Sequence, residues 1–411
     1  MKTHFFLFFV QLFFLYSYGQ NTYVPDDNFE NYLETHNVAG EEVTIGSSNS
    51  MGNGIANDNY VLSNRIASVV NLQVNNQNIS DLTGIEDFTS LVVLRCEFNS
   101  LSNLNLNQNT QLQHLYCYNN NLSSLDLSQN NNLIDISCSN NLLTNISLDS
   151  SPYLRYFFAN NNLLNDIDVS SNTLLERLQV SENNLTHLNV ISNSNLIMLR
   201  CAGNLLTELN TTNNPNLGEI DCSGNQISQL DLTNNTHLVF FYALYNRLER
   251  INLSSHPDLL EIGLSNNSLN YLNIRNGANY NLWHFEAYNN ENLNCIIVDD
   301  IAYSQTNFTL VNSSVTFVEN ESDCNSLNIE DGNINSELII LNNPIKNKTL
   351  KIKTNQAVVM NIYSINGKFI SKYNVSKGEH SIKMGVASGI YFIKVNFLEK
   401  NTKRFYKIII N

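Results

Sequence analysis

A period of 21 residues limits what this chain can fold into more than any other feature. From Leu91 to about Tyr280 the same columns recur in nine repeats without a change of register. In each repeat an apolar residue stands three positions before a fixed asparagine, and another stands two positions after it. The asparagine column consists of Asn99, Asn120, Asn141, Asn162, Asn183, Asn204, Asn225, Asn246 and Asn267. A fixed short period is typical of a solenoid, in which each repeat is one turn of chain.

The apolar columns predict a parallel sheet along one face of the solenoid. One turn of chain cannot bury its apolar side, so stacked turns must cover one another. Leu115, Tyr116 and Cys117 should alternate between the two faces of a short strand, with neighbouring strands about 4.8 Å apart. The asparagine amides should bond backbone groups at the turn that leaves the strand, because an unpaired buried polar group costs about 1–3 kcal/mol. We therefore interpret the asparagine column as structural and not catalytic.

The repeat Leu-x-x-Leu-x-Cys-x-x-Asn-x-Leu-x-x-Leu-x-Leu, as it stands at 91–106, resembles the leucine-rich repeat family. The resemblance covers about half of the chain and implies a curved solenoid that binds partners, with its parallel sheet on the concave face. Leu72 and Val74 indicate a diverged first coil, and Phe285 and Ala287 a last one. We place the repeats at 66–292 and expect Thr211, in a leucine column, to weaken its coil.

The ends of the repeat array predict caps and a route out of the cell. Residues 1–19 combine Lys2, an apolar run and small residues, which is typical of a secretory signal peptide. Residues 20–65 should form an N-terminal cap with a short helix at about 24–33, because Phe29, Tyr32 and Leu33 share one face. Residues 293–324 resemble the C-terminal cap of some bacterial leucine-rich repeat proteins. After removal of the signal peptide, no segment is apolar enough to span a membrane.

The seven cysteines fall into two groups. Five occupy the same strand column and are interpreted as small buried hydrophobic residues, at Cys96, Cys117, Cys138, Cys201 and Cys222. Cys295 and Cys324 lie beyond the regular repeats. They are either unpaired or joined by a disulfide, which would contribute on the order of 3–4 kcal/mol.

The charge of the chain reverses near residue 337. Residues 20–337 carry eight Arg, no Lys and 35 acids, a net charge of −27. Residues 338–411 carry 12 Lys, Arg404 and two acids, a net charge of +11. Such a reversal marks a domain boundary, with 325–337 as the linker. The acidic body argues against a nucleic-acid partner. In the basic tail, Lys alternates with Ile and Val, which favours a solvated sheet face over an anionic partner or a membrane.

The tail at 338–411 has seven short apolar runs separated by turn residues, which predicts a small all-β, Ig-like sandwich. It resembles the type A C-terminal sorting domain of the bacterial type IX secretion system. The motif residues that carry this resemblance include Asn366 and Gly367 in one hairpin turn, and Gly389 and Tyr391 near a later strand. The resemblance implies that the secretion machinery is a partner, and that the body is secreted or attached to the outer-membrane surface.

The sequence offers no motif for catalysis. It contains no Gly-rich phosphate loop, no Gly-x-Ser-x-Gly and no Cys-x-x-Cys, so we predict no enzyme and no cofactor. His114 and Cys117 should point to opposite faces of a strand, so no metal site is predicted. The histidines spread over the repeats, at 114, 187, 237, 256 and 284, are interpreted as surface residues.

The outward columns of the strands are therefore the candidate site. The candidate ligand-binding residues of the concave face are Arg95, Phe98, Tyr116, Tyr118, Phe158, Arg200, Tyr242, Tyr245 and Tyr288. Exposed aromatic rings can anchor a protein loop or stack on a sugar, although Tyr and Phe also favour strands on their own account. We predict a secreted or cell-surface recognition or adhesion module whose ligand is an unidentified protein or glycan. The alternative is an acidic structural coat that associates with Ca²⁺.

Overall fold

The structure is a computed structural model that describes residues 20–327, 338–365, 367–398 and 402–410. The chain divides into two units between Cys324 and Asn325. The expected signal peptide, Asn366 and most of the expected linker lie outside the described residues. Within the described part, no helix has the length and apolar character needed to cross a membrane.

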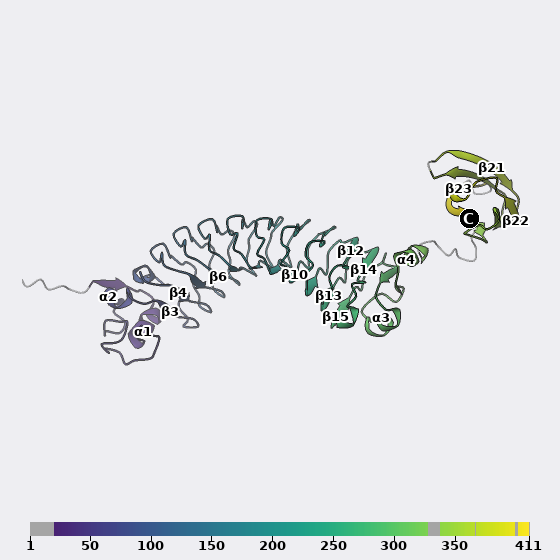
Figure 1. The fold of residues 1–411 in the computed structure, drawn as a ribbon. Coiled ribbons are helices and arrows are strands. Elements are labelled where there is room, and N and C mark those ends of the chain that lie inside the picture. Colours follow the sequence, from purple (N-terminus) through teal and green to yellow (C-terminus); the bar gives the residue numbers. More distant parts are fainter. Residues whose placement is uncertain (1–19, 328–337, 366, 399–401, 411) are drawn as a thin grey trace, which may run out of the picture. The chain divides into compact units, whose positions relative to one another are not determined.

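The first unit is a curved solenoid with an 11-stranded parallel sheet along its concave face (Figure 1). Neighbouring strands pair one repeat apart, so that Leu94 lies opposite Leu115 and Leu115 opposite Ile136. The predicted parallel solenoid is confirmed, including its two diverged end coils. The strands are β3 (Asn71–Gln73), β4 (Val93–Arg95), β5 (His114–Tyr116), β6 (Asp135–Ser137), β7 (Tyr156–Phe158), β8 (Arg177–Gln179), β9 (Met198–Arg200), β10 (Glu219–Asp221), β11 (Phe240–Tyr242), β13 (Glu261–Gly263) and β15 (His284–Glu286).

The core of the solenoid consists of apolar columns that stack from coil to coil. Leu115 at the centre of β5 and Cys117 just after it are both fully buried. The five cysteines of the Cys117 column are free thiols and all are buried. Burial raises the pKa of the Cys138 and Cys222 thiols to about 12. These cysteines therefore pack as small hydrophobic side chains and are poor nucleophiles.

The asparagine column bridges adjacent coils. The side-chain amide of Asn183 donates to the carbonyl oxygens of Ala159, at 2.9 Å, and Val180, at 3.1 Å. Its Oδ1 accepts from the backbone N–H of Leu164 at 3.0 Å. Asn120, Asn141, Asn162, Asn204, Asn225, Asn246 and Asn267 repeat this pattern. Each amide thus pairs backbone groups that the turn has removed from the sheet.

A second asparagine column, which the sequence analysis missed, runs through the turn before the strand. Its members are fully buried: Asn109, Asn130, Asn172, Asn193, Asn214 and Asn235. Asn193, for example, donates to the carbonyl oxygens of Val169, at 3.0 Å, and Asn172, at 2.9 Å. The hydroxyl of buried Thr211 donates to Oδ1 of Asn235 at 2.9 Å. Thr211 therefore has a hydrogen-bonding role in its coil that the sequence did not reveal.

His256 takes the place of asparagine in this second column. It is only 1% exposed, and its Nε2 lies 3.0 Å from the carbonyl oxygen of Leu232. The expectation of a surface histidine is therefore wrong at this position. Burial lowers the pKa of His256, because the charged imidazolium loses its hydration there.

We expect His256 to make the solenoid less stable below about pH 6.5. The folded-state pKa is lower than the unfolded one, so the unfolded chain binds the proton first and stability falls as the pH drops. His256→Asn keeps the donor to Leu232 without a titrating group, so its stability should fall less. The measurement is urea unfolding of both proteins at about pH 7.5 and about pH 5.5. Equal losses in the two proteins would contradict the assignment.

The N-terminal cap covers the first coil. It contains the antiparallel pair β1 (Asn21–Tyr23) and β2 (Tyr60–Leu62) with the helices α1 (Asp27–Thr35) and α2 (Ser63–Ile66), and η1 (Ile85–Asp87) follows β3. Phe29, Tyr32 and Leu33 of α1 are all buried. Oδ1 of Asp26 caps α1 by accepting from the N–H of Phe29, while its Oδ2 accepts from the N–H of Ser80. One carboxylate thus joins the cap helix to the repeats.

The C-terminal end of the solenoid gains a second parallel sheet on the opposite, convex face, which was not predicted. Its strands, in spatial order, are β12 (Arg250–Asn252), β14 (Tyr271–Asn273), β16 (Cys295–Ile297) and β17 (Thr316–Val318). The elements η2 (Asn279–Asn281), α3 (Ile301–Asn307) and α4 (Glu321–Leu327) complete this end. Cys295 and Cys324 form a disulfide.

The second unit consists of two antiparallel sheets around its own core. One sheet contains β18 (Leu338–Ile340), β19 (Thr349–Thr354) and β22 (Gly378–Lys383). The other contains β20 (Val358–Ser364), β21 (Phe369–Val375), β23 (Gly389–Phe397) and β24 (Thr402–Ile410). Seven strands in two sheets confirm the predicted small sandwich. Of the expected motif residues, Gly367 lies in the β20–β21 turn, and Gly389 and Tyr391 lie in β23.

Candidate functional site

The early part of the concave face is built around Tyr116 of β5. Its hydroxyl donates to Oδ2 of Asp135 on the next strand at 2.5 Å. Burial and the bond to Asp135 raise the pKa of Tyr116 to about 12. The guanidinium of Arg95 lies 4.2 Å from the centre of the Tyr116 ring and 3.6 Å from the carboxylate of Glu97. The Tyr116 side chain therefore lies between the cation of Arg95 in the preceding coil and the anion of Asp135 in the following coil.

The same diagonal pairing recurs along the sheet. Arg200 of β9 lies 2.5 Å from the carboxylate of Glu219 on β10, and the hydroxyl of Tyr242 donates to Glu261. Burial and this bond raise the pKa of Tyr242. In each pair the acid follows its partner by 19 residues, from the third position of one strand to the first position of the next. This spacing is the signal by which Asp135, Glu219 and Glu261 could have been found in the sequence.

Phe98 and Tyr245 lie in the turn that follows the strand, at the rim of the concave sheet and not on the strands themselves. Their φ angles are 57° and 51°, in the left-handed region, and their side chains are 52% and 64% exposed. Most other coils have Asn or Gly at this corner, at Asn119, Asn140, Asn161, Gly203, Gly224 and Asn266. A left-handed conformation costs a residue with a bulky side chain roughly 1–2 kcal/mol.

The remaining candidates are spread along the face. Tyr118 packs edge-on against Phe98, with ring centres 5.3 Å apart. Phe158 is half-buried on β7, and Tyr288 is exposed just after β15. The structure thus brings together Arg95, Tyr116, Tyr118 and Phe98 at the early end. Among the described residues, no ring-to-ring contact joins Tyr242, Tyr245 and Tyr288 at the late end.

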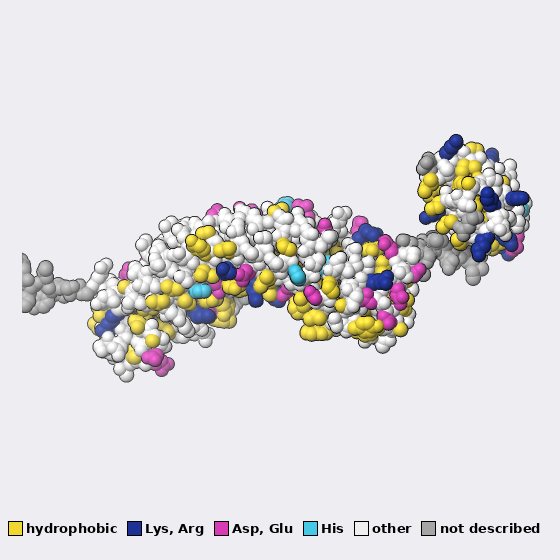
Figure 2. Space-filling view, viewed as in Figure 1, with side chains coloured by type: hydrophobic (Ala, Val, Ile, Leu, Met, Phe, Trp, Pro, Cys, Tyr) yellow, Lys and Arg dark blue, Asp and Glu magenta, His cyan; other side chains and the backbone are white. Residues whose placement is uncertain are grey.

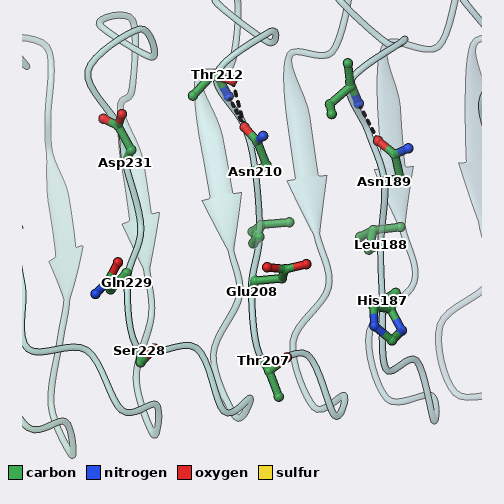
Figure 3. Close-up of a pocket in the computed structure, with 12 residues that line it drawn as sticks. His187, Leu188, Asn189, Thr207, Glu208, Asn210, Thr212, Ser228, Gln229 and Asp231 are labelled. Atoms are coloured by element: carbon green, nitrogen blue, oxygen red, sulfur yellow. Dashed lines mark hydrogen bonds between the residues drawn. The ribbon is translucent and has the colours of Figure 1, made fainter.

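The convex face carries a polar trough that the sequence analysis did not predict. It consists of two adjoining hollows of about 690 and 650 Å³, which share Gln229 and Asp231. Figure 3 shows two rows of side chains across the trough, with Leu188 between the rows and with Thr207 and Ser228 below the first row. The first row is His187, Glu208 and Gln229, and the second is Asn189, Asn210 and Asp231. The side chains of the second row accept hydrogen bonds from their own turns.

Fold and tail together define the class of this protein: a leucine-rich repeat solenoid joined to a sorting domain. Residues 342–411 match the family described as secretion system C-terminal sorting domain. This domain directs export through the type IX secretion system, to the cell surface or beyond it. Basic side chains gather on this second unit, whereas acids prevail on the first (Figure 2).

Solved structures give the comparison for the solenoid. The functional domain of InlJ from Listeria monocytogenes, which includes a cysteine ladder, is 21% identical with a TM-score of 0.54, over 96% of this chain and 99% of that chain. Internalin C2 from Listeria monocytogenes is 20% identical with a TM-score of 0.45, over 53% of this chain and 95% of that chain. No curated protein matches the sequence. At this level of identity, the likeness to InlJ concerns the fold alone.

Proposed function

We propose that this exported solenoid is a non-enzymatic recognition or adhesion module that binds a protein or glycan through its concave face. The observation that carries the proposal is the fixation of outward side chains by the next coil, as in Tyr116 with Asp135 and Tyr242 with Glu261. Side chains that are already ordered lose little entropy when a partner binds. The side chains of the concave sheet are therefore already ordered for binding before a partner arrives.

The arrangement of acids supports a binding function over catalysis. Acid–base catalysis needs two convergent groups in different environments. Here Asp135, Glu219 and Glu261 each lie on a different strand and are already paired with a Tyr or an Arg. Within the described ranges, no group of three or more His, Cys, Asp or Glu side chains is placed to hold a metal ion.

The test is a binding screen of the full chain against glycan and protein libraries. A variant with Tyr116, Tyr118, Tyr242 and Tyr245 changed to Ala should lose the partner by more than about 100-fold, because aromatic anchors dominate such interfaces. The matched control changes Tyr23 and Tyr60 to Ala, since these exposed tyrosines lie in the N-terminal cap. A partner that binds all three proteins equally would contradict the concave site.

A further inference from the structure

A row of apolar residues lines the edge of the concave sheet where the chain enters the strands. Its members, one per coil, are Ile197, Gly218, Val239, Leu260 and Trp283. Trp283 is 75% exposed and Ile197 is 39% exposed. Figure 2 shows apolar side chains gathered on the concave side near β13 and β15. Four steps between coils make this row about 20 Å long.

Gly218 opens a notch in this row. A hollow of about 190 Å³ lies there, with apolar walls from Ile197, Met198, Val239 and Phe240. Arg177 and Glu219 complete its lining. An apolar cavity of about 150 Å³ is enough to bind benzene. The notch therefore has room for one aromatic ring or one branched aliphatic side chain.

Nothing in the backbone requires glycine at position 218. Its φ lies outside the left-handed region, and an added Cβ would make only ordinary contacts, at 3.7 and 3.8 Å, with two carbonyl oxygens. Its N–H donates to the carbonyl of Ile197, and its carbonyl accepts from the N–H of Val239. Ile197 and Val239 make the same bonds with their own neighbours. The absence of a side chain at position 218 therefore creates the notch and does not stabilise the fold. In regular structure, glycine lowers stability by about 0.5–1 kcal/mol relative to alanine.

The charges beside the notch point to the kind of group that would enter it. Glu219 is already paired with Arg200. Among the described residues, no carboxylate lies within ion-pairing distance of Arg177, although acids outnumber Arg by 35 to eight in residues 20–337. An unpaired guanidinium at the mouth of an apolar notch suits an anchor side chain that stands beside a carboxylate.

We propose that a partner protein inserts an aromatic or branched aliphatic side chain into the Gly218 notch, places a neighbouring carboxylate on Arg177, and extends along the apolar row to Trp283. This inference rests on the proposed recognition function and narrows its ligand from a protein or glycan to a protein. The anchor supplies apolar burial, the carboxylate supplies orientation, and the exposed indole of Trp283 supplies a second contact about three coils away.

Phenylacetate is the direct probe, because it joins an aromatic ring to a carboxylate. Its binding to the full chain is followed by ligand-observed NMR, with benzyl alcohol as the uncharged comparator. Gly218→Val fills the notch and should weaken both probes by at least about tenfold. Arg177→Gln should weaken phenylacetate alone, by about five- to tenfold. Gln113→Val is the matched control, since it changes the corresponding position of a distant coil.

The outcomes separate this inference from the proposed function. Equal phenylacetate binding by the wild type and Gly218→Val, or no binding by either at millimolar concentration, would overturn the notch. Urea unfolding of Gly218→Val confirms that the variant is folded. The library screen could also find a partner that binds Gly218→Val normally but no longer binds the four-tyrosine variant. Such a partner would refute the notch as a binding site and would still support the concave face as the binding surface. A protein partner lost by Gly218→Val, and kept by Gln113→Val, supports the inference.

Discussion

An Asn183→Ala variant is expected to lose about 3–5 kcal/mol of unfolding free energy, because one amide satisfies three buried backbone groups and each unpaired group costs about 1–3 kcal/mol. The substitution removes the donor to the carbonyl oxygens of Ala159 and Val180 and the acceptor for the N–H of Leu164. These atoms belong to the turns of successive coils, where water cannot replace the amide. The measurement is the urea midpoint and slope of the full chain.

Asn184→Ala is the matched control for this prediction. Asn184 is the next residue along the chain, but its side chain is exposed, so its removal should change stability by less than about 0.5 kcal/mol. Because each coil of a solenoid contacts only its neighbours, the Asn183 variant should also unfold in a broader transition as the two halves of the array uncouple. Equal stability of the two variants would contradict a structural role for the column.

The repeat period predicted the solenoid because the apolar columns must face the core in every coil. The repeat period did not distinguish buried from exposed asparagines in the turn before each strand. Asn193 is fully buried and bridges two coils, whereas Asn195, two residues later, is exposed. Turns favour asparagine for either reason, so residue type alone does not separate them. His256 was missed for the same reason, since a buried position in a turn has no apolar signature.

The sequence predicted which residues of each strand point outward, but it did not predict which of their side chains contact one another. Tyr116 was expected to be outward, yet its bond to Asp135 depends on a diagonal register across two strands. Phe98 was predicted to lie on the concave face with Tyr116 and Tyr118, as one cluster of exposed aromatic residues in the early coils. In the structure β4 ends at Arg95, and Phe98 turns the chain in a left-handed conformation. The length of a three-residue strand is set by the turn, which the apolar columns do not specify.

Removal of the disulfide is expected to be the second large effect, because it releases the cap that closes the C-terminal end of the core. Cys295 and Cys324 are 29 residues apart, and a closed loop of this size is worth about 3–4 kcal/mol in the loop-entropy model. The bond fastens α4 against β16, where the cysteines pack with Ile297 and Val318. A variant with both cysteines changed to Ser should lose about 3 kcal/mol or more of unfolding free energy.

Dithiothreitol distinguishes the disulfide from the five buried thiols of the Cys117 column, which we call the cysteine ladder. The reductant should lower the melting temperature of the wild type toward that of the double-Ser variant and leave the variant itself unchanged. The ladder cysteines, of which Cys138 is an example, are at most 1% exposed, and burial raises their pKa. Cys295 and Cys324 are themselves only 1% and 5% exposed, so their reaction with iodoacetamide requires that reduction releases the cap. The wild type should therefore react only after reduction, at these two cysteines, while the ladder cysteines stay buried in the repeats. A reductant effect in the double-Ser variant would place the redox sensitivity in the ladder and contradict a cap held by one disulfide.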